Sequence, residues 1–521
     1  MSTLISRNPA TGEVIQELNT TRLEDLPQIF SKAQAAQLRW AAVPVKKRAK
    51  FLIHLREVLI DHVDSIVDLI SRENGKPRYE AMVNEVLPCV DMLTHFAKRA
   101  PKLLRNQPIP LTLMKHRKSY LNYWPLGTVL VISPWNYPFL LPFADILIGL
   151  ITGNAILFKP SEITPCIGLK IQELLHEAGL PDDVLQTLVG DGSIAAAAIQ
   201  HKPNKIFFTG SVATGKKVMA AAAEFLIPVN LELGGKDAMI VLPDADLDYA
   251  TSAALWGGFS NSGQVCASVE RILVHERILN PFLESLKTKI AQLRQNPQHL
   301  SPHSQTDLGA ITLEKQKTTY ERHLSQAKDR NALMITGGHF SPDRTFLAPT
   351  VVTGPQIETL DIYNEETFGP VVAVTPFKTV SEAIQKANHS KYGLLASIIT
   401  KNLSLGEEIA KQLAVGTVTI NEVVYTAGLG ETPWGGVKDS GFGKTHSDLG
   451  IYEFVNTRHI HRPRWSALVF KSPWWFPYTP YQYETFRSFF ELYRASWIDK
   501  IKAVPHFLWN LIQFIKNEKR L

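Results

Sequence analysis

Residues 119–144 read SYLNYWPLGTVLVISPWNYPFLLPFA and contain no charged side chain. By length alone this stretch could cross a membrane as a helix. It holds four prolines, however, and proline interrupts the hydrogen-bond ladder of a helix (Pro125, Pro134, Pro138 and Pro142). We therefore interpret it as a buried strand, Thr128–Ile132, that enters a tight loop.

Short apolar runs alternate with helical patterns on the C-terminal side of this strand. The expected strands are 155–158, 185–189, 205–208 and 228–232, and the expected helices are 166–178, 194–200 and 215–225. Such alternation predicts an α/β fold with a parallel sheet, in which ligands bind at the carboxyl ends of the strands. A second alternating series between residues 270 and 421 predicts a second α/β domain.

Composition limits the class of protein. The chain has 521 residues, of which 45% are hydrophobic and 20% charged, as in a soluble globular protein of two or three domains. Three cysteines offer neither a disulfide framework nor paired metal-ligand spacing, so we assign no metal. The first residues, MSTLISRNPATGEV, lack the apolar segment of a secretory signal, which favours a cytoplasmic setting. We expect no nucleic-acid partner.

Cys266 lies in the segment FSNSGQVCASVER, residues 259–271. Of the three cysteines, it alone follows a small, polar, glycine-containing run. Such a run lets the backbone approach closely and leaves a thiol reachable from a cleft. Taken by itself, Cys266 is either a small core residue beside a loop or a reactive thiol.

A second loop, FFTGSVATGKK at residues 207–217, follows an expected strand and opens a helix. It nearly matches the phosphate-loop pattern of nucleoside triphosphatases, but Lys217 stands where that pattern needs a hydroxyl for Mg²⁺. The helix N-terminus after Gly210 still offers free N–H groups to a phosphate. The loop therefore indicates a cofactor that carries phosphate.

Other polar side chains follow expected strands, and each has two interpretations. Asn136, in the apolar loop PWNYP at 134–138, either braces that loop or donates to an oxyanion. Lys159 and Glu162 either hold ribose hydroxyls or belong to a solvated turn. Glu232 is either a general base for water or an ion-paired carboxylate at a turn.

Together and in this order, these segments resemble the aldehyde dehydrogenase superfamily over nearly nine-tenths of the chain. The motifs are NPATG (8–12), PWN (134–136), KPSE (159–162), FTGS (208–211), ELGG (232–235), GQxC (263–266) and EExFGP (365–370). The resemblance implies a NAD-binding domain (1–107 with 126–234), a catalytic domain (235–445) and a β oligomerisation extension (108–125 with 450–463). Residues 464–521 would form a C-terminal extension, and a homodimer or homotetramer is expected.

The resemblance also implies roles for individual residues. Cys266 would be the nucleophile, Glu232 the general base and Asn136 an oxyanion donor. The cofactor-binding residues would be Lys159, Glu162, Gly210, Ser211, Gly215, Glu366, Phe368 and Trp135. Tyr137 and Trp434, with Trp256, would line an apolar substrate tunnel, although core packing is the simpler explanation of Trp256.

The implied reaction oxidises an aldehyde to a carboxylic acid. The Cys266 thiolate, with its pKa brought below about 8.5 by nearby positive charge and N–H groups, would attack the aldehyde. Hydride transfer to NAD would leave a thioester, and Glu232 would activate water to hydrolyse it. Glu162 should bond both ribose hydroxyls of NAD and repel a 2′-phosphate, which favours NAD over NADP.

Residues 464–521 differ in composition from the rest of the chain. They contain nine Lys/Arg, four Asp/Glu, 16 of the 48 aromatic residues and five of the ten tryptophans. Seven apolar residues have the spacing of one helix face, which Pro505 should end (Tyr483, Phe486, Phe490, Tyr493, Trp497, Ile501 and Val504). Aromatic and basic residues on amphipathic helices suit peripheral contact with a membrane. Packing on the catalytic domain or on a partner subunit is the alternative.

This extension resembles those of superfamily members that act on long, lipid-like aldehydes. The leading hypothesis is therefore NAD-dependent oxidation of a hydrophobic or long-chain aldehyde. The alternatives are a dehydrogenase for a small carboxylated semialdehyde, a cysteine hydrolase, and a non-catalytic membrane-associated scaffold.

Overall fold

The structure is a computed structural model of the chain. It describes residues 3–295, 305–466, 472, 474–494 and 496–518. The chain forms two compact units, Met1–Arg105 with Asn122–Arg458, and Asn106–Leu121 with His459–Leu521.

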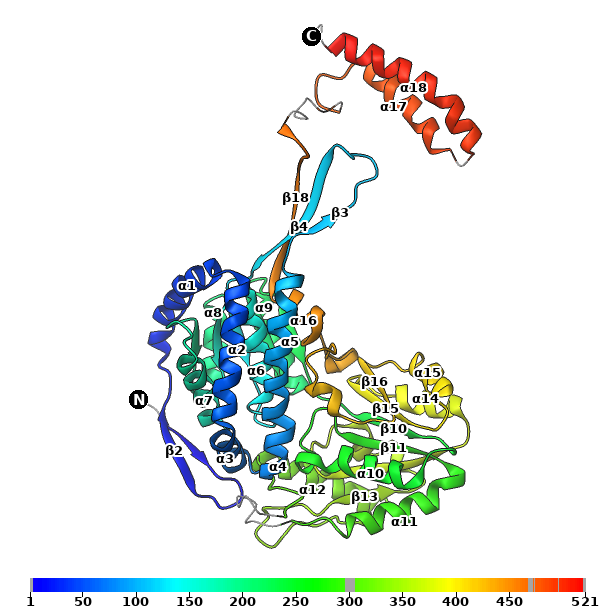
Figure 1. Ribbon diagram of the computed structural model, residues 1–521. Helices are drawn as coiled ribbons and strands as arrows, with labels where there is room; N and C mark the ends of the chain where they lie inside the picture. The colour runs from blue at the N-terminus through cyan, green and yellow to red at the C-terminus, as the bar shows by residue number, and fades with distance from the viewer. Residues whose placement is uncertain (1–2, 296–304, 467–471, 473, 495, 519–521) are drawn as a thin grey trace. The chain divides into compact units, whose positions relative to one another are not determined.

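The first unit begins with a two-stranded ribbon and a group of helices. β1 (Thr3–Arg7) pairs antiparallel with β2 (Val14–Asn19). The helices that follow are α1 (Leu26–Ala42), α2 (Val45–Asp61), α3 (Val63–Asn74), α4 (Arg78–Ala81) and α5 (Leu87–Leu103). In α2, Leu52, Leu55 and Leu59 are fully buried, as their helical spacing predicts. α2 and α5 pack side by side (Figure 1).

A six-stranded sheet in the order β17-β9-β8-β5-β6-β7 forms one half of this unit. Its strands are β5 (Thr128–Ile132), β6 (Ala155–Lys159), β7 (Leu185–Thr187), β8 (Lys205–Thr209), β9 (Val229–Glu232) and β17 (Gly441–Phe442). All are parallel except β17. The connecting helices are α6 (Leu140–Thr152), α7 (Pro165–Glu177), α8 (Gly192–Gln200) and α9 (Val212–Ala223). Every residue of β5 is buried, so the uncharged stretch supplies a core strand, as predicted.

A seven-stranded sheet in the order β12-β13-β14-β11-β10-β15-β16 forms the other half. Its strands are β10 (Asp237–Val241), β11 (Val269–His275), β12 (Leu333–Thr336), β13 (Thr350–Thr353), β14 (Val371–Phe377), β15 (Leu395–Ile399) and β16 (Thr417–Ile420). Only β12 among them pairs antiparallel. The two parallel sheets confirm the predicted α/β fold class.

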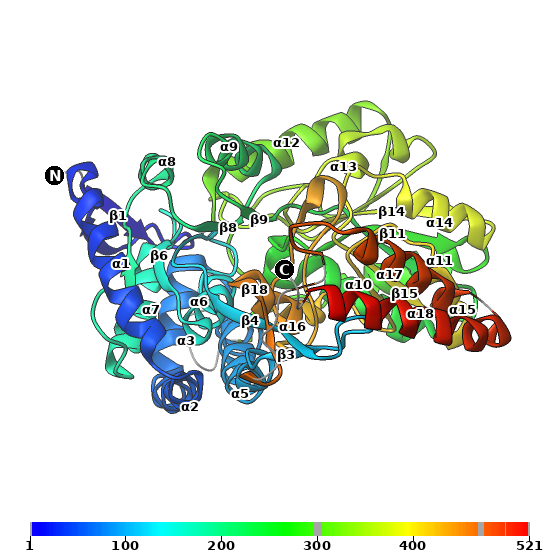
Figure 2. The ribbon, with the colours of Figure 1, turned by 90° about the horizontal axis from the view of Figure 1, so that it is seen from above.

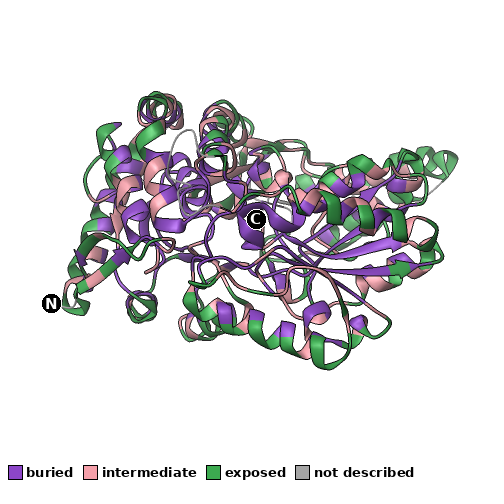
Figure 3. Ribbon diagram, turned by 90° about the horizontal axis from the view of Figure 1, so that it is seen from below, coloured by how far each residue is buried: buried purple, intermediate pink, exposed green. Residues whose placement is uncertain are grey.

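Helices cover this second sheet, as Figure 2 shows. They are α10 (Leu247–Phe259), α11 (Leu279–Ile290), α12 (Glu314–Asp329), α13 (Asp361–Asn364), α14 (Val380–Asn388) and α15 (Leu403–Ala410), and α16 (Ser447–Glu453) follows β17. The strands are mostly buried and the helices expose their outer faces (Figure 3). This is the burial that a sheet covered on both sides requires.

The second unit contains strands and a pair of helices. β3 (Gln107–Ile109), β4 (Arg117–Pro125) and β18 (Val455–Pro463) form a sheet in the order β18-β4-β3, and β4 and β18 continue into the first unit. The predicted β-extension, 108–125 with 450–463, overlaps these strands, but β3 begins one residue earlier and the range 450–463 also includes the end of α16. α17 (Pro480–Phe490) and α18 (Trp497–Glu518) pack against each other.

Two expectations for the C-terminal helices are wrong. Pro505 does not end a helix but lies inside α18, where the packing of Phe507 on Phe489, with ring centroids 5.4 Å apart, helps offset the lost hydrogen bond. The seven-residue apolar face is also not continuous, because the backbone is extended at Arg494, between α17 and α18. Within the residues described, we find no helix with the length and apolar character needed to cross a bilayer.

Candidate active site

A cavity of about 1050 Å³ lies at the carboxyl ends of the six-stranded sheet. The residues that follow four of its parallel strands line it, at 133–136, 161–162, 210–211 and 233–234. The carboxyl ends of parallel strands meet at one edge of a sheet, so these residues converge although they are far apart in sequence. Cys266 and residues 365–366 also line the cavity. It therefore brings together Cys266, Glu232 and Asn136.

The loop that carries Cys266 has an unusual backbone. Asn261, Ser262 and Gly263 have positive φ values of 48°, 54° and 69°. A Cβ atom on Gly263 would overlap the carbonyl group of Gly369, so glycine is required by both conformation and space. The polar, glycine-containing run seen in the sequence thus fixes a tight loop against a second loop of the site.

The Cys266 thiol is half-buried at the cavity, whereas Cys89 and Cys166 are buried elsewhere in the core. Burial raises the pKa of the Cys266 thiol, and the carboxyl groups of Glu232, Asp237 and Glu366 raise it further. The expectation that positive charge would lower this pKa is wrong, because the charged side chains that act on the thiol are acidic.

Asn136 is buried beside the Cys266 loop. Its side-chain amide donates to the Gln264 carbonyl at 3.1 Å, and its backbone carbonyl accepts from Lys76 Nζ at 2.8 Å and from Asn261 Nδ2 at 2.9 Å. The amide therefore braces the loop, and it also lines the cavity with the thiol. The two interpretations of Asn136 are compatible.

Glu232 ends β9 and is partly buried in the cavity wall. Burial raises its pKa to about 8; Lys444 opposes this rise and the negative charge of Asp145 adds to it. A Cβ atom on Gly435 would lie 2.8 Å from Glu232 Oε1, so glycine there leaves room for the carboxyl group. A carboxyl group with this pKa exchanges protons near neutral pH, as a general base must.

Glu366 and Phe368 lie in the loop after α13 and line the cavity. The Glu366 carboxylate accepts a hydrogen bond from the Gly235 N–H at 3.1 Å, and burial raises its pKa to about 8. The Phe368 ring meets the Trp135 ring edge-on, with centroids 5.5 Å apart. Three of the residues predicted to bind the cofactor therefore come together.

A buried ion pair between Lys236 and Glu270 holds this loop in place. Glu270 accepts hydrogen bonds from the backbone N–H groups of Thr367 at 2.8 Å and Phe368 at 2.9 Å. Lys236 also donates to the Thr367 hydroxyl at 3.1 Å. Since a buried charge is costly without its partner, the pair fixes the loop to β11.

Four further residues predicted to bind the cofactor also line the cavity: Lys159, Glu162, Gly210 and Ser211. Lys159 is 3% exposed, and its Nζ lies 3.0 Å from Glu162 Oε2. Ser211 caps α9, with its hydroxyl accepting from the Thr214 N–H at 3.3 Å, and Gly210 precedes it. Apolar side chains of α8 and α9 line the cavity here (Ala195, Ile199, Val218 and Ala221).

This set of groups fits a dinucleotide. The paired Lys159 and Glu162 suit ribose hydroxyls, the N-terminus of α9 suits a pyrophosphate, and the apolar side chains suit a flat base. Glu366 offers a second carboxylate near Cys266.

Three predicted site residues do not line the cavity within the described part of the chain: Gly215, Tyr137 and Trp434. A Cβ atom on Gly215 would meet the Leu233 side chain at 2.6 Å, so its role here is close packing of α9. Lys76 Nζ lies 3.9 Å from the centre of the Tyr137 ring. Trp434 is buried, and Trp256 is half-buried against the same core. The substrate roles of Tyr137 and Trp434 stay predictions.

Two acidic residues that sequence reasoning missed act on the site. Glu80, in α4, accepts a hydrogen bond from the Asn261 N–H at 2.9 Å and so anchors the Cys266 loop. Asp145 is buried in α6, where it accepts from the Thr445 hydroxyl at 2.9 Å, and burial raises its pKa to about 7. The signal for Asp145 was its position as a lone acid in the apolar run 140–152.

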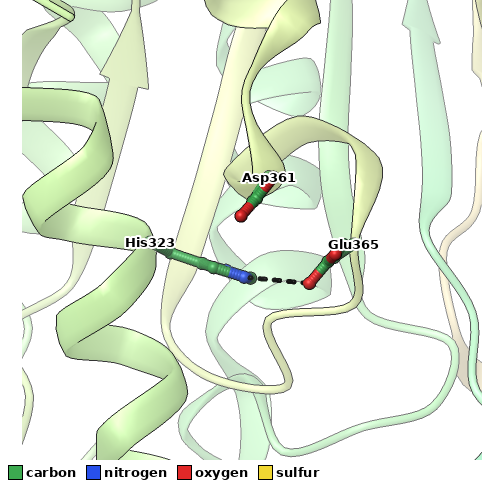
Figure 4. Close-up of side chains that lie close together, drawn as sticks. All are labelled: His323, Asp361 and Glu365. Atoms are coloured by element: carbon green, nitrogen blue, oxygen red, sulfur yellow. Dashed lines mark ion pairs between the residues drawn. The ribbon is translucent and has the colours of Figure 1, made fainter.

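His323, Asp361 and Glu365 also lie together beside the cavity, with possible ligand atoms within 4.8 Å of one another (Figure 4). The Arg322 guanidinium bonds the carboxylates of both Asp361 and Glu365. Burial and the charges of Lys236 and Arg322 lower the pKa of His323 to about 4, so its ring is neutral. We interpret this cluster as an ion-pair network around Arg322.

The fold and cavity define a class: a parallel α/β enzyme with a thiol, a carboxyl and an amide at one dinucleotide-sized site. Residues 2–460 match the aldehyde dehydrogenase family model. The chain belongs to the aldehyde dehydrogenase family, and it is an oxidoreductase that acts on aldehydes.

Individual relatives and solved structures support this assignment to the family. The chain is 37% identical to a 4,4′-diapolycopene aldehyde oxidase of Methylomonas sp, over 94% of this chain and 91% of that protein. It is 37% identical to a putative NADP(+) succinate-semialdehyde dehydrogenase of Mycolicibacterium smegmatis, over 87% of each chain. It also resembles the NAD+ complex of an aldehyde dehydrogenase from Bacillus cereus, with a TM-score of 0.85, 31% identity, and coverage of 89% and 94%.

Proposed function

We propose that this protein oxidises a hydrophobic or long-chain aldehyde to its carboxylic acid with NAD, through a covalent intermediate on Cys266. The observation that carries the proposal is the convergence of Cys266, Glu232 and Asn136 on one cavity that fits a dinucleotide.

The thiol begins the reaction. Its sulfur, as the thiolate, forms a bond to the aldehyde carbon, and the carbonyl electron pair moves to oxygen to give a hemithioacetal oxyanion. The Asn136 amide and the Cys266 backbone N–H are the donors we assign to that oxyanion. Burial and the nearby acidic groups raise the pKa of Cys266, so the thiol must release its proton before the sulfur attacks.

NAD bound here would supply the acceptor for the hydride that leaves the hemithioacetal carbon. Lys159, Glu162, Gly210, Ser211, Trp135, Glu366 and Phe368 would hold it. The thioester that results needs water, and Glu232 would take a proton from that water as its oxygen bonds to the acyl carbon. The C–S bond then breaks, which releases the acid and regenerates Cys266.

Two observations support a hydrophobic substrate. The similarity to the diapolycopene aldehyde oxidase spans 94% of the 521-residue chain, which cannot fit within residues 1–460, so it continues into the C-terminal segment. That segment also exposes many aromatic and aliphatic side chains. Peripheral contact with a membrane through residues 464–521 is part of this proposal, as is a cytoplasmic location.

A small carboxylated aldehyde is the second candidate, because several relatives are named as putative succinate-semialdehyde dehydrogenases. The same relatives are named for NADP(+), so they also favour the alternative cofactor.

The edge strand β18 suggests how subunits would associate. It is the outer strand of the order β18-β4-β3, and an edge strand offers unpaired backbone groups to another chain. We propose that it pairs in a homodimer, with a homotetramer as the larger form.

The experiment follows NADH absorbance with purified protein, NAD, aldehydes of increasing chain length, and succinate semialdehyde. We expect kcat/KM to rise with chain length, and Cys266→Ala to abolish NADH formation while Cys166→Ala, a buried cysteine outside the cavity, retains it. Full activity in Cys266→Ala would refute the mechanism. A preference for the semialdehyde would replace the hydrophobic substrate, and turnover without NAD would indicate a hydrolase.

A further inference from the structure

The helical pair of the second unit buries polar side chains of α17 and exposes many large apolar side chains of both helices. Its buried residues on α17 are Gln482, Thr485 and Ser488, spaced three apart. Thr485 donates to the Asn510 carbonyl of α18 at 3.0 Å, so this small, polar stripe forms part of the helix contact. Two helices in water normally bury their apolar stripes against each other.

Large apolar side chains of both helices are instead exposed. In α18, Trp497 is 69% exposed, Trp509 63% and Ile501 60%, while Phe514 is buried. The other exposed apolar residues of the pair are Tyr481, Tyr483, Phe486, Phe490, Ile498, Val504, Leu508, Ile512 and Ile515. So many exposed apolar side chains on one pair of helices mark an interaction site.

The charges of the same unit complement an anionic partner. Residues 106–121 and 459–483 contain six Lys/Arg and no Asp/Glu. Lys115, Lys118, Arg462 and Arg464 are exposed on or beside the strands of this unit. Exposed tryptophan and tyrosine in the same unit as exposed lysine and arginine suit the boundary between lipid headgroups and acyl chains.

From these observations we infer that the second unit is a docking surface for an anionic lipid bilayer. The helical pair α17–α18 inserts its aromatic and aliphatic side chains among the headgroups, and the acid-free basic segments contact lipid phosphates. This deepens the membrane contact of the proposed function by assigning the lipid charge and the two kinds of residue that recognise it. In this proposal the two helices lie in the plane of the interface, with their exposed apolar side chains toward the acyl chains.

The full-length protein is tested by sedimentation with phosphatidylcholine vesicles that contain or lack phosphatidylserine. We expect binding that is strengthened by phosphatidylserine and weakened by salt. The apolar variant Trp497→Ser/Trp509→Ser/Ile512→Ser should lose binding to both vesicles. The charge variant Lys115→Gln/Arg117→Gln/Lys118→Gln should lose roughly tenfold or more in affinity for the anionic vesicles only.

Matched controls come from the first unit. Leu38→Ser removes another exposed apolar side chain, and Lys32→Gln/Lys46→Gln/Lys47→Gln removes three exposed charges. Both controls should bind vesicles like the wild type. Equal losses in the controls and test variants, or no wild-type sedimentation, would overturn the inference. So would unchanged vesicle binding in the apolar variant together with altered size by light scattering, which would assign the surface to a second copy of the chain.

Activity separates this inference from the proposed substrate. Every variant should oxidise a small water-soluble aldehyde at the wild-type rate, since the substitutions lie outside the cavity. Vesicle binding without oxidation of long-chain aldehydes would refute the substrate and uphold the docking surface. Oxidation of such aldehydes by protein that never binds vesicles would uphold the substrate and refute the surface.

Discussion

Glu232 is the residue that should set the pH dependence of turnover. Burial raises its pKa to about 8, so the fraction in the base form increases as pH rises through that value. We expect kcat for a soluble aldehyde to rise from roughly pH 7 to 9. Glu232→Gln should remove this rise and lower steady-state kcat by about 100-fold or more. Stopped-flow absorbance should still show a burst of NADH, because hydride leaves before water attacks. A wild-type kcat in Glu232→Gln would rule out the assigned base.

Asp145 should tune this pKa without touching substrate. Its negative charge raises the pKa of Glu232, so Asp145→Asn should lower that pKa and move the rise in kcat to lower pH. The pH profile distinguishes this effect from a loss of stability, which would lower kcat at every pH. Asp182→Asn, at an exposed position, is the control. An unshifted profile in Asp145→Asn would show that the two carboxyl groups are not coupled.

Glu162 should decide between the two nicotinamide cofactors. Its carboxylate, paired with Lys159, would repel the 2′-phosphate of NADP. Glu162→Gln should therefore raise the ratio of kcat/KM for NADP to that for NAD by about tenfold, as measured by reduced-cofactor absorbance. Glu173→Gln, whose carboxylate pairs with Lys170 on the surface, should leave the ratio unchanged. A fall in the ratio would reverse the assigned role.

At this scale, the motifs predicted which residues meet but not how they titrate. Sequence patterns reveal strand ends and loops, and the predicted site residues lie at such places (Cys266, Glu232, Asn136, Lys159 and Glu366). The pKa of Cys266 depends instead on burial and on carboxyl groups that the fold brings near it, including Asp237, which no motif singled out for this effect. Charge around a residue is a property of the folded neighbourhood and is not encoded locally.

Among the elements, the Cys266 loop has little room for substitution at Gly263. Gly263→Ala would combine a positive φ with an overlap against the Gly369 carbonyl. We expect it to lower the free energy of unfolding by more than about 1 kcal/mol and to reduce activity. Gly179→Ala is the control, since Gly179 has a φ of 87° but nothing within 4 Å of an added Cβ. Chemical denaturation of both variants measures the difference, and equal stabilities would show that the close approach costs nothing.

The elements themselves show why some predictions succeeded and others failed. β5 and β6 are buried on both faces, and their short, continuous apolar runs are typical of such buried strands. Pro505 was expected to end a helix because proline is unfavourable inside one, yet α18 continues through it. The contact with α17 is a tertiary interaction, and local sequence rules do not include it.

For the whole molecule, the division into two units predicts that catalysis survives loss of the C-terminal segment. The residues lining the cavity all belong to the first unit. A chain that ends after Pro463 keeps β18 and should oxidise a small soluble aldehyde with a kcat/KM within about twofold of the full-length value. NADH absorbance and size-exclusion chromatography check activity and assembly. A large loss of activity in a folded truncation would show that the segment contributes to the site.

Because the cavity and the aromatic helical pair belong to separate units, mutations can change one without changing the other during evolution. A substitution on the outer face of α17 or α18 can alter attachment while leaving the reacting groups at their positions. A lineage could thus acquire, exchange or discard its C-terminal helices and keep the ancestral chemistry throughout.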